Sequence, residues 1–500
     1  MGRRRLYGAV ALAAAVVHLG ALWNHFALDD VTIITVNPTV HSLQGLWTAF
    51  TLSYWGGNLS TTVYRPLAIA SFALDWQVGS TVWFHAVNIL WHVAATVLVA
   101  VLARRWAGDT AGLVAGLVFA VHPVHVEAVA YVVGRSDLMA TCFTLLAVYA
   151  AVEVGSVWWS AVAFALGMLS KESAVVAPAL VAGVWIAGIR PLPAWRRVTG
   201  FAVAAVLIGV GYTALRLVVF RQYGEGLTAI APIFMDLSPV QVRITAVAGL
   251  ADAARLLLLP VHLSTDYSPL ERTAVTSALD VRFIAGAAAL GAWGATIVLA
   301  WRAQRRKVEA FGLAWVGVAY SPVANLVFPI GVFVAERLLY LPSAGLAIAV
   351  GAALRNLRGR ALALAVGVLV LAGGVRSAVR VPAFRDNVAA AQALLRDAPQ
   401  SYWTHDFIGW QFLWARRPDL ALTSFQQSAA LFPKDTRVYL AAADAAFTLG
   451  HPALADSLLA TAERVCARCL VSYHNQAMAA RLRGDSASAD SLLAHAARVR

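Results

Sequence analysis

Long apolar runs alternate with short polar stretches through the first three quarters of the chain. A helix needs about 20 predominantly apolar residues to cross a bilayer. Runs of near-spanning length lie at residues 6–26, 85–103, 110–126, 138–154, 156–170, 174–189, 198–219, 282–301, 309–327, 338–354 and 361–376. This pattern predicts an all-α, polytopic membrane bundle of about eleven transmembrane helices over residues 1–380. The first run follows basic residues, as a signal peptide does, but it lacks a convincing cleavage site, and we interpret it as a retained anchor.

Composition and charge support a membrane protein. Of 500 residues, 60% are hydrophobic and 13% are charged, whereas an ordinary soluble domain is about one quarter charged. This excludes a soluble globule, and the net charge of +13 does not indicate nucleic-acid binding because the basic residues cluster at alternate junctions between apolar runs. The clusters are Arg3 to Arg5, Arg104 with Arg105, Arg190 with Arg196 and Arg197, Arg302 to Lys307, and Arg355 to Arg360.

Basic clusters of this kind are typical of cytoplasmic loops. They predict a cytoplasmic N-terminus and an extracytoplasmic C-terminus, and the Ala/Arg-rich composition favours a bacterial plasma (inner) membrane over the endoplasmic reticulum. Two long outer loops follow from this threading, at residues 27–84 and 220–281. Each contains an amphipathic piece, beginning at His41 and at Ser238. Such pieces either lie along the membrane surface or pack on the bundle.

The composition changes after residue 380, where charged residues rise and no run is long enough to span a bilayer. A period of 34 residues relates Ala421, Ala455 and Ala489; Gly450 and Gly484; Phe425, Leu459 and Leu493; and Pro399 and Pro433. Small residues at this spacing are typical of tetratricopeptide repeats, in which paired helices approach closely. Residues 381–500 are therefore predicted to form an extracytoplasmic domain of about three such repeats, with chance alignment of alanines as the alternative.

Several ionisable clusters share the predicted outer membrane level. Asp29 and Asp30 directly follow the first apolar run, and adjacent carboxylates at a membrane boundary are costly unless they are solvated or paired. The other clusters hold Arg65; His122, His125, Glu127, Arg135 and Asp137; Lys171 and Glu172; and Glu336 and Arg337. In so apolar a chain, this convergence indicates a polar cavity, with internal salt bridges as the alternative for each cluster.

No metal site or cofactor is predicted. Pro123 interrupts the segment that holds His122 and His125, and their spacing differs from the helical pair of zinc proteases. A divalent metal is a possible but not favoured addition. Cys466 and Cys469 form at most half of a zinc motif, so an external disulfide or two free thiols are the alternatives there. The chain also lacks a phosphate-binding Gly-rich loop.

The outer-face motifs together resemble a known family. In chain order they read FALDDVTIITVNP, YRPL, FHAVNILWH, HPVHVEAVAYVVGRSDLMA, SKES, LPVHLSTDYS and AERLLYLPS, followed by the repeats. They resemble the membrane O-mannosyltransferases that carry transmembrane and tetratricopeptide-repeat regions, within the multi-spanning glycosyltransferases of GT-C type that use lipid-phosphate sugars. The repeat array is short and the chain compact, which fits a bacterial relative.

The resemblance implies transfer of a sugar, mannose in the family, from a polyprenyl-phosphate donor to a hydroxyl acceptor such as protein Ser or Thr, with inversion. It implies Asp30 as the general base and Asp29 as its orienting partner, with these roles open to exchange. Phosphate-side candidates are Arg65, Arg135, Lys171 and Arg337, assisted by His122 or His125, and the site is also lined by Glu127, Asp137, Glu172 and Glu336. The partners implied are the donor, an extended peptide held by the repeats, and the bilayer, but not nucleic acid. The alternatives are a lipid or sugar transporter (flippase) and a non-catalytic repeat scaffold.

Overall fold

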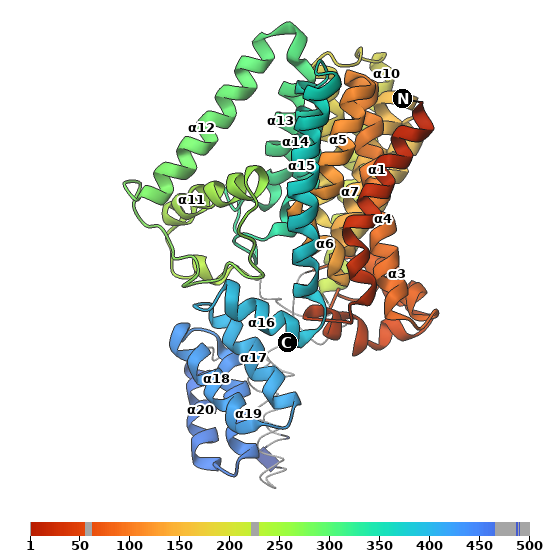
Figure 1. The fold of residues 1–500 in the computed structure, drawn as a ribbon. Helices are drawn as coiled ribbons and strands as arrows, with labels where there is room; N and C mark the ends of the chain where they lie inside the picture. Colours follow the sequence, from red (N-terminus) through yellow and green to blue (C-terminus); the bar gives the residue numbers. More distant parts are fainter. Residues whose placement is uncertain (1, 56–62, 222–229, 466–486, 489, 491–500) are drawn as a thin grey trace. The chain divides into compact units, whose positions relative to one another are not determined.

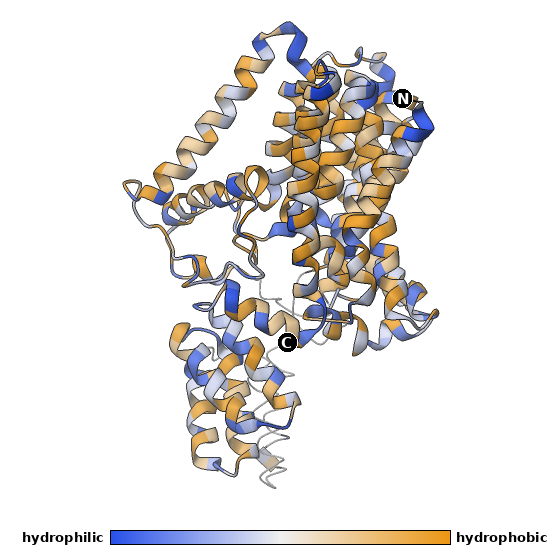
Figure 2. Cartoon of the chain, viewed as in Figure 1, coloured by the Kyte–Doolittle hydropathy of each residue, from blue (hydrophilic) through white to orange (hydrophobic). Residues whose placement is uncertain are grey.

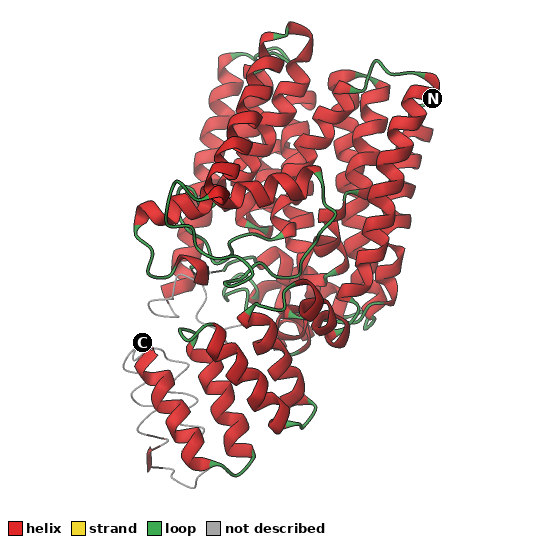
Figure 3. Ribbon diagram, turned by 60° about the vertical axis from the view of Figure 1, so that its left-hand side comes forward, coloured by secondary structure: helices red, strands yellow, loops and turns green. Residues whose placement is uncertain are grey.

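A computed structural model describes residues 2–55, 63–221, 230–465, 487–488 and 490. All regular elements among these residues are helices (Figure 3), as the hydrophobic pattern predicts. The chain divides into two compact units. Unit 1 comprises Met1–Gln222, Gly226–Leu263 and Val275–Asp386, and unit 2 comprises Tyr223–Glu225, Ser264–Ala274 and Asn387–Arg500.

Unit 1 contains the membrane-spanning helices. Six helical segments within the described residues are long and apolar enough to cross a bilayer: Arg3–Trp23 (α1 with η1), Thr81–Ala107 (α4), Val132–Val154 (η5, α7 and η6), Trp195–Arg221 (α10), Val281–Arg302 (α12) and Gly359–Phe384 (α15 with η12). A bent pair, α5 (Asp109–Val121) followed by η4 and α6 (Pro123–Ala130), brings the number to seven if it forms one span. The chain is thus a multi-pass membrane protein.

The prediction of eleven spans is not confirmed. Four of the expected spans correspond to short helices: α8 (Val157–Ser170), α9 (Ala177–Ile186), α13 (Lys307–Tyr320) and α14 (Tyr340–Ala353). A helix rises about 1.5 Å per residue, so 14 residues cover only about 21 Å of a hydrocarbon core about 30 Å thick. Polar residues such as Lys171 end these helices early, and hydropathy averaged over a window does not report such breaks.

The helices of unit 1 pack closely where glycine removes the side chain. A Cβ atom on Gly312 of α13 would lie 2.6 Å from the carbonyl oxygen of Gly345 in α14. A Cβ atom on Gly351 of α14 would lie 2.4 Å from the carbonyl oxygen of Ala111 in α5. These approaches hold α14 at the centre of the bundle, where Trp315 and Tyr340 are fully buried.

The predicted basic clusters gather at one end of unit 1, the end that holds the start of α1 (Figures 1 and 2). Some of them form ion pairs with the few acidic residues there: Glu153 accepts Arg105 at 3.1 Å and Arg190 at 2.9 Å, and Glu309 accepts Arg355 at 2.6 Å. This segregation fits the predicted threading, and the direction in which unit 1 lies in the membrane stays a prediction.

The two amphipathic pieces of the long loops differ. The piece from His41 contains only a single short helix, α2 (Gly45–Thr48), followed after residues 56–62 by α3 (Pro66–Trp76). The piece from Ser238 forms a full helix, α11 (Pro239–Leu258), begun by a capping box between Ser238 and Gln241. α11 packs against α12 and buries one face within unit 1, including Val242 and Leu256.

Unit 2 contains helices α16 (Asn387–Asp397), α17 (Tyr402–Trp414), α18 (Pro418–Leu431), α19 (Thr436–Thr448) and α20 (Pro452–Val465). The starts of α17 and α19 are 34 residues apart, and so are those of α18 and α20. Ala421 and Ala455, related by the predicted period, are both buried between helices. The tetratricopeptide assignment stays a prediction, because Gly484, Ala489 and Leu493 lie outside the described residues, as do Cys466 and Cys469.

Candidate active site

The candidate site lies at the end of unit 1 away from the basic clusters, where α3 and α6 are found (Figure 1). The chain here leaves regular helix repeatedly. Between α5 and α7 (Arg135–Tyr149) it passes through η4 (Pro123–His125), α6 (Val126–Ala130) and η5 (Val132–Gly134). Pro123 causes the first break, since it cannot continue a helix from the preceding turn. Such breaks turn polar side chains of the segment inward.

Three ion pairs form the centre of this site. Arg65, which precedes α3, donates through Nε to Glu172 at 3.2 Å. Lys171 Nζ contacts both carboxylate oxygens of Asp137, at 2.6 and 2.7 Å.

The third pair joins Arg337 to Glu127, which accepts both the guanidinium and the backbone N–H of Arg337, the latter at 2.8 Å. Glu127 thereby fixes the start of η11 (Glu336–Leu339), the short helix that leads into α14.

The three pairs belong to one electrostatic cluster. Lys171 interacts with Arg65 and with Arg337, in addition to its partner Asp137. The pKa of Lys171 is lowered to about 8, mainly by burial and also by these two like charges, against the attraction of Asp137. Arg337 also interacts with Asp29 and Asp137. Residues from five separate stretches of sequence thus converge, which is the convergence that the sequence indicates.

Asp29 is a half-buried carboxylate of this cluster that has no ion-pair partner within the described residues. Its backbone N–H donates to the Tyr131 hydroxyl at 2.7 Å, and the carboxylate also interacts with that hydroxyl. Burial raises the pKa of Asp29, although Arg337 and Tyr131 oppose the shift. Asp29 is thus a partly exposed residue whose carboxylate interacts with Tyr131 and Arg337.

The Asp30 side chain faces the backbone of η5 (Val132–Gly134) and not the ion-pair cluster. Its side chain is only 1% exposed, and its two oxygens accept the backbone N–H groups of Val133 at 2.8 Å, Ala27 at 3.3 Å and Val132 at 3.4 Å. Burial raises the pKa of Asp30 to about 8, against the opposing effect of these N–H groups. Asp30 therefore connects the loop after α1 to η5 and holds Asp29 in place.

Arg135 does not join the cluster. Its guanidinium is fully buried, donates to Asn88 at 2.7 Å and to the Phe84 carbonyl at 2.9 Å, and pairs with Asp75. Every face of this side chain is therefore used within the bundle, which leaves no room for a phosphate.

Each of the two histidines also bonds a group of the bundle, although His125 Nδ1 has no hydrogen-bond partner within the described residues. His125 is fully buried and bonds the Ser343 hydroxyl at 2.7 Å, and His122 bonds the Leu257 carbonyl at 3.0 Å. Glu336, expected to line the site, is likewise fully buried.

Two tyrosines, Tyr131 and Tyr54, lie at the site although the sequence does not predict them there. Tyr131 lies in the motif HPVHVEAVAYVVGRSDLMA, in which the sequence singles out ionisable neighbours such as Glu127 and Asp137. Tyr54 is buried, and the Arg65 guanidinium lies 5.2 Å above its ring centre. The sequence around Tyr54 carries no signal that separates it from the other aromatic residues of an apolar loop. In the part of the chain that the structure describes, no group of three or more His, Cys, Asp or Glu side chains is placed to hold a metal ion.

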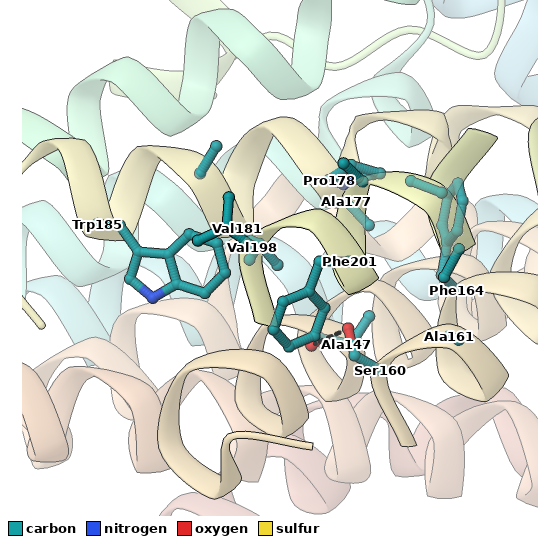
Figure 4. Close-up of a pocket in the computed structure, with 14 residues that line it drawn as sticks. Ala147, Ser160, Ala161, Phe164, Ala177, Pro178, Val181, Trp185, Val198 and Phe201 are labelled. Atoms are coloured by element: carbon teal, nitrogen blue, oxygen red, sulfur yellow. Dashed lines mark hydrogen bonds between the residues drawn. The ribbon is translucent and has the colours of Figure 1, made fainter. Parts of the chain in front are cut away.

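An apolar pocket of about 180 Å³ lies between α7, α8, α9 and α10. Phe164, Trp185 and Phe201 surround it together with several alanines (Figure 4). The hydroxyl of Ser160, a polar group in its lining, is used in a hydrogen bond to the Ala147 carbonyl at 3.0 Å. The pocket therefore suits a hydrocarbon chain. α9, which lines it, begins shortly after Lys171 and Glu172 of the ion-pair cluster.

Comparison with known proteins confirms the family resemblance. Residues 77–215 match the sequence model of the family described as dolichyl-phosphate-mannose-protein mannosyltransferase. The mouse (Mus musculus) protein O-mannosyl-transferase TMTC3 is 29% identical over 68% of this chain and 41% of its own length, and mouse TMTC4 is 29% identical over 77% and 61%. The chain thus spans about half the length of these curated relatives.

Among solved structures, one similar chain is described as ArnT from Cupriavidus metallidurans bound to undecaprenyl phosphate. It is 16% identical to this chain, with a TM-score of 0.44 over 90% of this chain and 78% of that one.

Proposed function

We propose that this chain is a membrane glycosyltransferase. Its residues 77–215 match the dolichyl-phosphate-mannose-protein mannosyltransferase family, and it is similar to protein O-mannosyl-transferases. It transfers a sugar, mannose by analogy with the relatives, from a polyprenyl-phosphate donor to a hydroxyl group. The observation that carries this proposal is the half-buried Asp29 carboxylate, which has no ion-pair partner among the described residues and interacts with Arg337 of the ion-pair cluster.

The reaction follows from this charge arrangement. The acceptor oxygen forms a bond to the anomeric carbon while the bond from that carbon to the phosphate oxygen breaks. The acceptor proton passes to Asp29, and the bonding electron pair leaves on the polyprenyl phosphate. A positioned base of this kind typically contributes about 10²–10⁴-fold to the rate. A single displacement inverts the anomeric configuration.

Asp29 suits the role of base better than Asp30 does. Three backbone N–H groups already occupy the Asp30 oxygens, and its side chain has almost no exposure. Asp29 keeps its accessible carboxylate, and the Tyr131 hydroxyl orients it. The structure thus favours exchanging the two roles assigned to these residues by analogy, with Asp30 as the positioning residue.

The cations also divide into a buried group that supports the site and partly exposed groups that can meet the donor. The Lys171 side chain is only 6% exposed, and both oxygens of Asp137 contact it. Lys171 therefore has a supporting role and does not contact the phosphate. Arg65 and Arg337 are 20% and 29% exposed. These two guanidinium groups stabilise the negative charge that develops on the departing phosphate, and the acidic partners Glu172 and Glu127 keep them in position.

The apolar pocket between α7 and α10 accounts for the lipid part of the donor (Figure 4). A polyprenyl phosphate carries its charge at one end of a long hydrocarbon, so its site needs cations beside an apolar surface. Lys171 lies at the end of α8 and precedes α9, and both helices line the pocket. The lipid chain occupies the pocket and the phosphate lies toward Arg65.

The acceptor and the membrane face extend the proposal further. The acceptor is the Ser or Thr hydroxyl of an extended peptide, and the helical hairpins of unit 2 provide a surface for it if they form a tetratricopeptide array. The site and unit 2 are proposed to lie on the extracytoplasmic side of a bacterial plasma membrane. The basic clusters, gathered at the end of unit 1 away from the site, support this side through the positive-inside rule.

The direct test is a transfer assay with the purified chain, a polyprenyl-phosphate mannose and a Ser/Thr-containing peptide. Mass spectrometry detects one added hexose on the peptide with the wild-type chain and none with Asp29→Asn. Asp419→Asn, which changes an exposed carboxylate of unit 2, is the matched control and retains transfer. Movement of the donor across a vesicle membrane without a new glycosidic bond would instead identify a transporter, and Asp29→Asn with full transfer would exclude Asp29 as the base.

A further inference from the structure

Tyr54 carries a buried hydroxyl that bonds nothing in the described part of the chain. The residue is 4% exposed, and its oxygen has no hydrogen-bond partner. Its backbone is held in place, since the Tyr54 N–H donates to the Val63 carbonyl at 2.9 Å. The ring packs edge-to-face against Trp55, with ring centres 6.0 Å apart. The position of the side chain is thus fixed, while its polar atom is left unsatisfied.

An unsatisfied buried hydroxyl is unfavourable for folding, because the group loses its bonds to water and gains none in exchange. Tyr64, in the same loop, shows the usual solution: its hydroxyl donates to the Phe50 carbonyl at 2.9 Å. A phenylalanine at position 54 would fill the same space without this cost. The hydroxyl of Tyr54 therefore needs a partner that the described residues do not supply.

The surroundings of Tyr54 identify the kind of group that it meets. The Arg65 guanidinium lies over its ring, and Asp29 and Asp137 of the ion-pair cluster interact with it electrostatically. Burial raises the pKa of Tyr54, so the hydroxyl keeps its proton and is a hydrogen-bond donor. A proton donor beside a partly exposed guanidinium matches an oxyanion, whereas the carboxylates of the cluster are better partners for the hydroxyls of a sugar.

We propose that the Tyr54 hydroxyl donates a hydrogen bond to a phosphoryl oxygen of the bound donor, next to Arg65. This proposal rests on the proposed function, because the ligand is the polyprenyl phosphate of that reaction. Tyr54 is then a phosphate-binding residue, and the folding cost of its unpaired hydroxyl is recovered when the donor binds.

The test compares Tyr54→Phe with Tyr64→Phe in the full-length chain. Melting temperatures are measured in detergent, and binding is measured with sugar-free polyprenyl phosphate. Tyr54→Phe is expected to melt at the wild-type temperature or above it, because it loses no hydrogen bond to the described residues. It is expected to bind the lipid phosphate about 10- to 100-fold more weakly, as expected for a hydrogen bond to a charged group. Tyr64→Phe, the stability control, is expected to melt at a lower temperature.

Four results would overturn the proposal, and they are separable. A lower melting temperature for Tyr54→Phe would mean that the hydroxyl has a partner inside the chain. Unchanged binding by a stable Tyr54→Phe would reject the phosphate contact while the proposed function stands. A loss of affinity for the sugar-bearing donor alone would assign the hydroxyl to the sugar. Failure of the wild-type chain to bind any polyprenyl phosphate would reject the proposed function together with this inference.

Discussion

Two polar clusters of unit 1, one around Arg135 and one around Lys171, contain the same residue types. They differ in whether polar groups are left without a partner among the described residues. Arg135 and Asp137 are two residues apart in the first turn of α7. Arg135 turns into the bundle, where Asp75, Asn88 and a carbonyl satisfy it completely. Asp137 turns toward Lys171 and the cluster that holds Arg337 and Asp29.

We interpret this difference as the one between a structural polar cluster and the proposed functional one. In the Arg135 cluster every strong donor has a partner and the guanidinium is fully buried. In the Lys171 cluster the carboxylate of Asp29 lacks a cation partner within the described residues, the hydroxyl of Tyr54 lacks a hydrogen bond, and two guanidinium groups are partly exposed. Because charged groups in a membrane bundle are unfavourable when unpaired, we propose that the incompletely paired cluster is the one that binds a ligand.

The largest effect is expected in the structural cluster. Arg135→Ala leaves Asp75 buried without its partner, and breaking a buried ion pair in this way costs about 3–5 kcal/mol. We expect a strong fall in the melting temperature and in the yield of folded protein, measured by thermal unfolding in detergent. Arg65→Ala, in a partly exposed pair, is the matched control and should unfold near the wild-type temperature. Equal melting temperatures for the two variants would contradict the division between the clusters.

A smaller effect on the reaction is expected from the exposed cations. Arg337→Gln keeps a hydrogen-bond donor and removes the charge, so the departing phosphate is less stabilised. We expect transfer to fall about 10- to 100-fold, measured as kcat/KM for the donor with the melting temperature recorded in parallel. A variant that folds and transfers at the wild-type rate would remove Arg337 from the phosphate site.

The pH dependence of transfer gives a third prediction. A base must be deprotonated, and burial holds the pKa of Asp29 above its ordinary value. Transfer is therefore expected to be complete above this raised pKa and to fall about tenfold per pH unit below it. Initial rates of the wild-type chain across acidic to neutral pH measure this limb. An acid limb at the ordinary pKa of an exposed aspartate, near 4, would mean that Asp29 is not the group that titrates.

The last prediction concerns stability and Asp30. Its pKa is about 8 in the folded chain and about 3.9 when unfolded, so the folded state binds the proton more tightly. Stability should therefore fall as the pH rises between these values, and change no further above pH 8. In Asp30→Asn this part of the pH dependence should vanish, because the amide does not titrate. Melting temperatures at pH 6 and pH 8 test this, and an unchanged dependence in the variant would reject the assignment.

The sequence predicts the helical class, the segregation of the basic clusters and the set of loops that form the site. These features depend on hydropathy and on the distribution of charge, which are local properties. The number of transmembrane spans is harder to predict from the sequence, because short helices such as α8 end at a polar residue within one apolar stretch. Reading a run of apolar residues as a full span therefore overestimates the count.

The inner arrangement of the site could not be read from the sequence. Asp29 and Asp30 are neighbours, and only the backbone path through the turn after α1 decides which carboxylate meets the N–H groups of η5. The same holds for Arg135 and Asp137, whose directions depend on their positions around α7. Tyr54 gives no signal at all, since an unpaired hydroxyl is visible only when every neighbour is placed.

The most direct measurement is the ratio of initial transfer rates between Asp29→Asn and Asp30→Asn, each corrected for its folded fraction. We expect Asp29→Asn to be slower than the wild-type chain by about 10²–10⁴-fold, the usual contribution of a general base. Asp30→Asn keeps an oxygen to accept the Val133 N–H, so its transfer rate should stay within about tenfold of the wild-type rate. The reverse order, with Asp30→Asn inactive and Asp29→Asn near the wild-type rate, would contradict the account.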